Sequence, residues 1–381
     1  MHLVRSLGRR GRWIGMIAGL AILTGGSLRA QGATATKRAV TPFAATIARL
    51  SEPSGYFDTD NLISNETSYL HVLPALHEMG VSGGAYIGVG PDQNYTYLAA
   101  IHARIAYIVD IRRDNLLQHL MFKALFARSR NRMEFLCRWL GRVPPPDVAS
   151  WDSRPIAVLL DWVDRQPANS EFAKTEADAI VAAAVATGVP LSEQDAATIR
   201  RFHAAFVKDG LQLRFTSFNR GPRPYYPTLE RLIVEKDPNG RQASYLATEE
   251  DWRFVKGLHA ADRIIPVVGN FAGSVALKAI AKDLQRMGEK VTAIYTSNVE
   301  QYIWRDGSFP KFADNVVALP LDRRGVIIRS YFGAGSGGQP HPRARDGYYS
   351  TQLVQALSDF AERHRKGGWT SYWELVTEGN R

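Results

Sequence analysis

The sequence contains a single cysteine, Cys137, among its 381 residues. No disulfide can therefore form within one chain, and a zinc site built on several cysteines is excluded. The chain also lacks an HExxH pair, a GxSxG nucleophile motif and a GxxxxGK(S/T) phosphate loop. These absences argue against a zinc peptidase, an α/β-hydrolase and a P-loop nucleotide hydrolase. We accordingly expect no metal site.

A long apolar run is missing as well. Residues 13–23 are apolar but too few for a membrane span, which needs roughly 20 residues. They follow four arginines within residues 5–12 and precede small and polar residues. This pattern predicts an export signal over residues 1–35, cleaved after Ala30 or Ala35, and hence an exported, periplasmic protein. The alternative is an uncleaved signal that anchors the chain in the inner membrane, the one membrane contact that we expect.

The excess of positive charge is small once this segment is set aside. The whole chain has 47 basic and 37 acidic residues, a net charge of +10. Five of the basic residues and none of the acidic ones lie in residues 1–35, so the rest of the chain carries only +5. This value gives no reason to expect a nucleic-acid partner, and a small molecule is the ligand that we expect.

Apolar segments of two lengths alternate along the rest of the chain and predict an α/β fold. Strands are expected at residues 85–87, 105–109, 264–268, 291–295, 316–319 and 326–331, and helices at 64–79, 95–102, 114–140, 171–186, 192–208, 273–287 and 350–364. A hairpin is expected around the turn at 237–240. The alternation favours one Rossmann-like domain over residues 36–381, with a doubly wound, mostly parallel sheet and a helical insertion at about 128–210.

A glycine turn joins the first two predicted strands. Gly88 and Gly90 let the backbone approach a ligand at the start of the next helix. Asp110 ends the second strand, 22 residues after Gly88, where a carboxylate can accept the hydroxyls of a ribose. The pattern predicts a nucleoside-type ligand. Gln93 stands where the dinucleotide motif has its third glycine, which disfavours a dinucleotide-dependent oxidoreductase.

The turn resembles the first motif of Rossmann-type S-adenosylmethionine-dependent methyltransferases, an apolar strand and an acid followed by x-G-x-G-x-G. Gly88 and Gly90 match it, Tyr86 stands at the position of the acid, and Asp92 replaces the third glycine. The resemblance implies S-adenosylmethionine as cofactor, with Gly88, Gly90, Asp92 and the ribose acid Asp110 lining its pocket. It also implies that Asn270 ends a later strand at the site.

A closer resemblance covers nearly all of residues 36–381. The segments GYFDTDNLISNE, YIGVGPDQNYTYLA, IAYIVDIRRDN, RIIPVVGNFAG and YTSNVEQYIW are similar to those of an uncharacterised family of bacterial methyltransferase-like proteins. This resemblance implies the fold of that family and carries no established reaction.

Two polar segments complete the predicted site. Before the first strand, Asn61, Asn65 and Glu66 are placed to meet the amino and carboxylate groups of the cofactor; a hydrogen-bonded turn and helix cap is the alternative. The second segment, residues 297–300, follows a strand and contains Glu300. We expect Glu66 or Glu300 to be the catalytic proton acceptor.

Two functions are consistent with these features. The first is a methyltransferase-like protein of unknown acceptor that binds S-adenosylmethionine. The second is a non-catalytic binding module of the cell envelope that kept the methyltransferase fold. Tyr86 and the predicted export favour the second, since S-adenosylmethionine is made in the cytoplasm. Asp110 and the polar segment before the first strand favour the first.

Overall fold

The structure is a computed structural model and describes residues 40–381 except 219–220, 222 and 334–337. The predicted export signal, residues 1–35, lies outside the described residues. Among the described residues, no helix combines the length and the apolar character needed to cross a membrane. The described part of the chain forms one compact unit.

A six-stranded sheet forms the centre of this unit, in the order β3-β2-β1-β4-β5-β6. The strands are β1 (Ala85–Gly88), β2 (Ile105–Asp110), β3 (Ile264–Val268), β4 (Val291–Ser297), β5 (Leu321–Tyr331) and β6 (Thr351–Ala356). The first five strands pair in parallel, and β6 runs antiparallel to β5. Strands β1 to β3 are buried throughout, as expected where helices cover both faces. The predicted α/β fold with a mostly parallel sheet is therefore confirmed.

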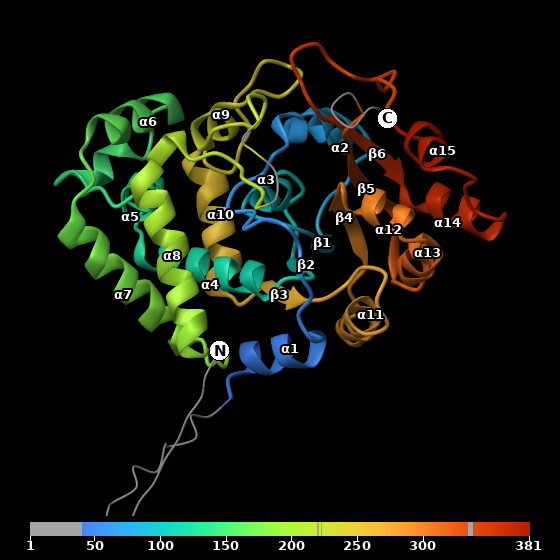
Figure 1. Cartoon of the computed structure of the whole chain (residues 1–381), viewed down its shortest axis with the longest axis horizontal. Coiled ribbons are helices and arrows are strands. Elements are labelled where there is room, and N and C mark those ends of the chain that lie inside the picture. Colours follow the sequence, from blue (N-terminus) through green and yellow to red (C-terminus); the bar gives the residue numbers. More distant parts are fainter. Residues whose placement is uncertain (1–39, 219–220, 222, 334–337) are drawn as a thin grey trace, which may run out of the picture. The chain divides into compact units, whose positions relative to one another are not determined.

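The connections place helices on both faces of the sheet (Figure 1). Helices α3, α4 and α10 cover one face, where α4 contacts β2 and β3. Helices α1, α11, α13 and α14 cover the other, where α1 contacts β3 and α14 contacts β5. The strand order reverses between β1 and β4, which makes the carboxyl ends of these two strands the expected ligand position.

The helices of the described residues vary from one turn to nearly five. They are α1 (Pro42–Leu50), α2 (Leu73–Glu78), α3 (Gln93–Ala100), α4 (Arg113–Arg128), α5 (Arg132–Trp139), α6 (Ile156–Arg165), α7 (Ser170–Ala186), α8 (Glu193–Asp209), α9 (Leu229–Val234), α10 (Glu249–Ala260), α11 (Ala276–Met287), α12 (Val299–Arg305), α13 (Phe309–Val317), α14 (Leu357–Arg365) and α15 (Tyr372–Thr377), with 3₁₀ turns η1 (Thr67–Val72), η2 (Val148–Trp151) and η3 (Gly210–Gln212).

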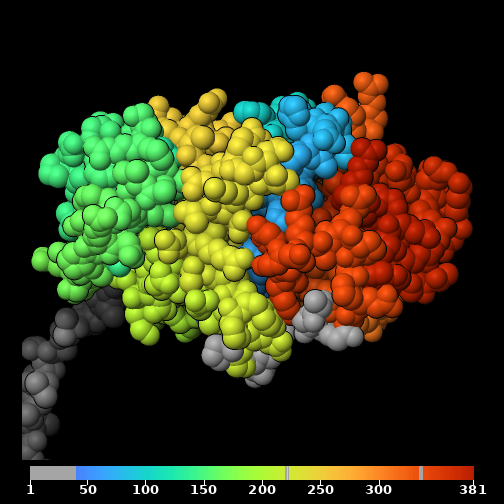
Figure 2. All heavy atoms as spheres, turned by 90° about the horizontal axis from the view of Figure 1, so that it is seen from above, coloured from blue at the N-terminus to red at the C-terminus, as the bar shows by residue number. Residues whose placement is uncertain are grey.

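The helical insertion between β2 and β3 extends beyond the predicted range of 128–210. Helix α4, which packs on β2 and β3, begins it, α10, which packs on α3 and α4, ends it, and α5 to α9 lie between them in the chain. Ser192 and Asp195 form the capping box that starts α8, as their spacing predicts. In Figure 2 the green and yellow insertion lies to one side and the orange-to-red C-terminal part to the other, with blue N-terminal residues between them.

Several predicted elements are wrong in type or extent. The helix expected at 64–79 is the 3₁₀ turn η1 followed by α2, and the one expected at 114–140 breaks between α4 and α5. The hairpin around 237–240 keeps its turn but has a single isolated bridge, between Lys236 and Gln242. The strand expected at 316–319 is the end of α13 and the residue pair after it, because Phe309, Phe312 and Val316 bury one helical face.

The largest error concerns residues 350–364, which were expected to be one helix. The first part is strand β6, and only residues from Leu357 on are helical. Gln352 and Gln355 flank the apolar pair Leu353 and Val354 and are themselves buried, and other side chains bond them. A buried strand with polar side chains does not show the apolar run that predicts a strand.

Candidate functional site

One cavity opens at the carboxyl ends of the central strands. The residues that follow β1, β2, β3 and β4 line it, together with residues 57–65 and the first part of α12. The empty volume bounded by the lining residues is about 870 Å³, which includes the space that opens to the solvent. Five of the predicted site residues line it, namely Asn61, Asn65, Gly90, Asp110 and Asn270. The other four, Glu66, Gly88, Asp92 and Glu300, do not.

Gly90 forms the tight part of the turn after β1. Its φ of 85° lies in the region that favours glycine. Two side chains on successive turns of α4 hold its carbonyl oxygen: Asn115 Nδ2 donates at 2.9 Å and His119 Nε2 at 3.0 Å. Burial lowers the pKa of His119 to about 4, so the ring is neutral and its Nδ1 accepts from the Tyr95 hydroxyl. Helix α4 therefore fixes the turn at the cavity edge.

Gly88 has a structural reason to be glycine. A Cβ atom there would lie 2.0 Å from Oδ1 of Asn94 and 2.5 Å from the ring of Tyr86. The Tyr86 hydroxyl donates to that same Oδ1 at 2.7 Å, and Asn94 Nδ2 donates to the carbonyl oxygens of Val89 and Pro91. Tyr86 stands where the methyltransferase motif has an acid. It supports the turn through its hydrogen bond to Asn94.

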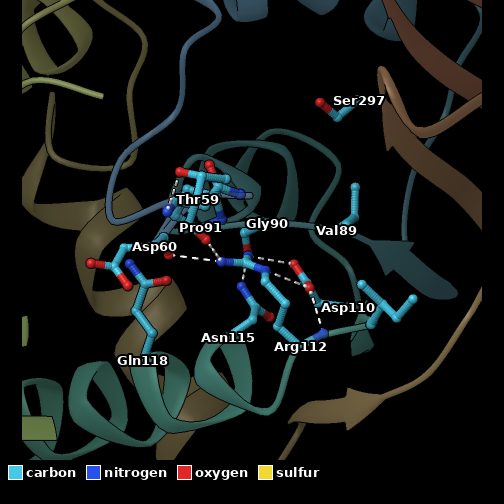
Figure 3. Close-up of polar contacts among 12 residues, drawn as sticks. Thr59, Asp60, Val89, Gly90, Pro91, Asp110, Arg112, Asn115, Gln118 and Ser297 are labelled. Carbon is cyan, nitrogen blue, oxygen red and sulfur yellow. Dashed lines mark hydrogen bonds and ion pairs between the residues drawn. The ribbon is translucent and has the colours of Figure 1, made fainter. Parts of the chain in front are cut away.

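Asp110 lines the cavity but is paired with Arg112 (Figure 3). Its Oδ1 accepts from the backbone N and Nε of Arg112 at 2.9 and 3.0 Å, and its Oδ2 accepts from Nη2 at 2.8 Å. Burial lowers the pKa of Arg112, but the charge and hydrogen bonds of Asp110, together with the charges of Asp114 and Asp60, more than offset this effect, so the pKa is raised and the guanidinium stays charged.

Arg112 also holds the polar segment that crosses the cavity. Its Nη1 donates to the carbonyl oxygens of Thr59 and Asp60, each at 2.8 Å. Beyond them, Gln118 of α4 donates to the carbonyl of Leu62 at 2.7 Å. Between these anchors Asn61 adopts a φ of 52°, which is uncommon for a residue other than glycine. The anchored backbone places Asn61 and Asn65 in the cavity wall.

Glu66 lies behind the cavity wall and is fully buried. The hydroxyls of Tyr295 and Ser330 lie 2.6 Å from its Oε2, Gln352 Nε2 lies 3.3 Å from the same atom, and the Ser297 hydroxyl donates to Oε1. All of these donors are uncharged. Burial raises the pKa of Glu66 above its ordinary value, although the hydrogen bonds act in the opposite direction.

Ser297 connects Glu66 to the cavity. It ends β4, lines the cavity and adopts a φ of 52°. Left-handed backbone at a non-glycine residue costs roughly 1–3 kcal/mol and is often found at functional sites. Here the conformation brings the hydroxyl onto Oε1 of Glu66 while the residue faces the cavity. Ser297 was not singled out by the sequence as a site residue of its own.

Glu300 and Asp92 face away from the cavity. Glu300 is fully buried and pairs with Arg329, whose Nε donates to it at 2.6 Å, so this carboxylate is committed to a structural ion pair. Asp92 accepts from the Tyr245 hydroxyl at 3.0 Å in a separate, smaller cavity. Burial raises the pKa of Asp92 to about 6.

Gln93 is a further polar residue in the wall. Its Nε2 donates to the Tyr295 hydroxyl at 3.2 Å. Its Oε1 is buried and accepts no hydrogen bond from the residues that the structure describes. An unpaired buried acceptor in a cavity wall is suited to a donor on a ligand. The sequence offered one signal for it, a polar residue at the position of the third glycine of the dinucleotide motif.

The comparisons with known proteins identify a family. The model described as "Domain of unknown function (DUF7790)" matches residues 61–143 and 160–375, which make up most of the chain. The chain belongs to this family. All nine predicted site residues lie within the matched stretches. No curated protein matches the chain.

Over the described ranges, no group of three or more His, Cys, Asp or Glu side chains is placed to hold a metal ion. Cys137 is buried in the helical insertion, and burial raises its pKa to about 12, so it is a protonated core residue.

Proposed function

We propose that the cavity binds S-adenosylmethionine and that the protein is a methyltransferase-like protein of the Rossmann type. One observation carries this proposal: the Gly90 turn and Asp110, on the adjacent strands β1 and β2, face a single cavity where the strand order reverses. In doubly wound folds, a glycine turn and an acid so placed bind a nucleoside.

Asp110 keeps capacity for a ribose although it is paired. A carboxylate offers about four lone-pair positions, and Arg112 occupies three of them. One hydroxyl group can therefore donate to Oδ2 without breaking the ion pair. Arg112 would then orient the carboxylate, and the charge of the pair would remain balanced.

The remaining parts of the cofactor find matching groups on either side of Asp110. Ile111 and Phe271 give an apolar surface beside the amide of Asn270, which suits an adenine ring. On the β1 side, a protonated amino group requires acceptors, and the unpaired Oε1 of Gln93 is one. Asn61 and Asn65 offer amides to the carboxylate of the methionine part.

The residues of this chain can also take up a proton. S-adenosylmethionine supplies a methyl group made electrophilic by its sulfonium. Ser297 Oγ would accept the proton of the methyl acceptor and pass its own proton to Oε1 of Glu66. Since burial raises the pKa of Glu66, this carboxylate holds a proton more readily than an exposed one, which suits a general base.

A non-catalytic binding module is the second candidate function. Two observations favour it: Asp110 is already occupied by Arg112, and Tyr86 supports the turn in place of an acid. An exported, periplasmic protein would also meet little S-adenosylmethionine. Such a module would use the same cavity to bind a small molecule and release it unchanged.

Titration calorimetry with the full-length protein tests the proposal. S-adenosylmethionine and S-adenosylhomocysteine are expected to bind and NAD is not. Asn61→Gly keeps the left-handed backbone and removes the amide, so it should weaken binding about tenfold, the loss of one or two hydrogen bonds. His102→Gly, at another left-handed residue outside the cavity lining, is the matched control and should bind as the wild type does.

Asp110→Asn examines the ribose contact. It keeps the shape of the side chain, so a folded variant, confirmed by its circular dichroism, should lose most of the affinity for both ligands. If folded protein that carries no co-purified nucleoside binds none of S-adenosylmethionine, S-adenosylhomocysteine and NAD, the cofactor proposal is overturned. Binding of S-adenosylhomocysteine that survives Asp110→Asn would show that the cofactor lies elsewhere.

A further inference from the structure

A second hollow adjoins the cavity and shares part of its wall. Residues on both linings include Asn61, Asn65, Ser297, Asn298 and Tyr302. We call this hollow the outer chamber. Its empty volume is about 1040 Å³, which includes the space that opens to the solvent. Ser297, the residue that reaches Glu66, therefore stands at the boundary between the two spaces.

Aromatic rings form much of the outer chamber. Tyr225 and Tyr349 stack with their centroids 3.8 Å apart and their planes 18° apart. Phe332 meets Tyr349 edge to face at 5.5 Å. Across the boundary with the cavity, Tyr302 meets Phe57 edge to face at 5.1 Å. These rings come from separate parts of the chain and line the hollow together, so they offer aromatic surface to a planar ligand.

The charge of the outer chamber has one sign. Arg223 and Arg305 line it, and none of its described lining residues is acidic. Arg223 donates to the Tyr225 hydroxyl, and Arg305, at the end of α12, is exposed. Neither arginine makes an ion pair within the described residues. The acid next to Arg305 in sequence, Asp306, lines the inner cavity and accepts from the backbone N of Ser308.

We propose that the outer chamber binds the methyl acceptor and that this acceptor is a small organic anion with an aromatic ring. The substrate class rests on the proposed function, whereas the binding itself does not. Arginine prefers carboxylate and phosphate groups, and it lies flat on aromatic rings. A ring held against the tyrosines, with its anionic group toward Arg223 and Arg305, directs its other end toward Ser297.

This combination favours an aromatic acid over simpler ligands. A neutral sugar would pack on the rings but would leave two guanidinium groups without an anion. A charged sugar would satisfy the arginines but would lack the planar aromatic face that stacks on the tyrosines. The outer chamber therefore distinguishes an aromatic acid from both, and each of them gives a control ligand.

The test measures binding of 4-hydroxybenzoate to the full-length protein in the absence of any nucleoside. The neutral 4-hydroxybenzyl alcohol and the anion glucuronate, which has no aromatic ring, are the matched probes. We expect 4-hydroxybenzoate to bind and the other two to bind at least tenfold more weakly, as the loss of a charged hydrogen bond implies. Arg305→Gln should weaken the binding of 4-hydroxybenzoate by a similar factor. Arg365→Gln, an exposed arginine of α14 that lines neither space, should have no effect.

The outcomes separate this inference from the cofactor proposal. If 4-hydroxybenzoate fails to bind, or binds no better than either control ligand, the inference is overturned even where S-adenosylhomocysteine binds. Binding that neither Arg305→Gln nor Arg223→Gln weakens would overturn it too. If 4-hydroxybenzoate binds in the expected way and S-adenosylhomocysteine does not, the outer chamber is an aromatic-acid site and the cofactor proposal alone has failed.

Discussion

Two glycines of the turn after β1 are required for different reasons. At Gly88 the limit is space, since Asn94 and Tyr86 occupy the volume of a side chain. At Gly90 the limit is backbone conformation, because φ is 85° while the nearest atoms to a Cβ lie 3.4 Å away or more. The sequence motif treats both glycines as cofactor contacts. Only Gly90 borders the cavity.

Alanine substitutions should therefore separate the two glycines. Gly88→Ala should lower the free energy of unfolding by about 2–4 kcal/mol, because it overpacks the core and breaks the bond between Tyr86 and Asn94. Gly90→Ala should cost about 1–2 kcal/mol, the strain of a left-handed alanine. Urea denaturation of both variants measures the difference. Equal losses, or a larger loss for Gly90→Ala, would contradict the structural role of Gly88.

Single residues also show how far the site could be predicted. Asp110 was found because a carboxylate at the end of β2 follows the glycine turn at a known spacing. Its partner Arg112 is only two residues away, but the sequence does not say which of its neighbours an arginine will bond. Glu300 was predicted from its place after β4, yet its side chain points back to Arg329. The position of a strand end is predictable, and the direction of a side chain beyond it depends on tertiary packing.

At the scale of elements, the parallel strands were the easiest to predict. Strands β1 to β4 are short apolar runs between turn residues, and each appears at its predicted place. Strand β6 was missed because its glutamines bond buried groups on neighbouring elements. The 3₁₀ turn η1 was taken for α-helix because both have apolar residues at similar spacing. The spacing of apolar residues along the chain indicates which positions are buried. A prediction from this spacing therefore fails where the buried side chains are polar.

Helix α4 is the element that sets the shape of the glycine turn. Asn115 and His119 are four residues apart and so lie on one face of the helix, and both donate to the Gly90 carbonyl. The turn thus depends on α4 in addition to its own glycines. A change in α4 should be transmitted to the cavity edge.

His119→Phe and His119→Gln form a matched pair that tests this dependence. Phenylalanine removes the donor to Gly90 and leaves the Tyr95 hydroxyl without its acceptor, so the free energy of unfolding should fall by about 1–3 kcal/mol. Glutamine carries an amide that can reach the same carbonyl and should restore part of the loss. Thermal denaturation near neutral pH, where the imidazole is uncharged, measures both. If the two variants are equally stable, the bond to Gly90 does not hold the turn.

At the scale of the whole molecule, Glu66 joins segments that are distant in sequence. It lies just before η1, yet Tyr295 and Ser297 of β4, Ser330 of β5 and Gln352 of β6 all bond its carboxyl group. One buried acid therefore ties the polar segment at the cavity to the C-terminal half of the sheet. Because its partners are neutral, the charge of this acid opposes folding, and the stability of the molecule should depend on pH.

The sign of that dependence follows from the raised pKa. In the unfolded chain Glu66 titrates near its ordinary value of 4.5, and in the folded protein it titrates at higher pH. Its contribution to stability is full below 4.5 and is lost as pH rises through the folded pKa. Asp92, whose pKa is raised from 3.8 to about 6, contributes with the same sign. Glu66→Gln removes the titration and keeps hydrogen-bonding capacity, so its melting temperature relative to the wild type should rise between about pH 4 and about pH 8.

The matched control is Glu176→Gln, another buried glutamate, whose carboxylate pairs with Arg128 and Arg138. There the charge is compensated, so the neutral variant leaves Arg128 without its acidic partner and Arg138 with Glu134 alone, and it should be less stable than the wild type at about pH 8. The two buried glutamates should thus respond in opposite directions to the same substitution at that pH. If Glu66→Gln instead loses more stability at about pH 8 than at about pH 4, the folded protein prefers the ionised carboxylate. Glu66 would then already be charged in the resting protein and could take the proton from Ser297 without a change in pH.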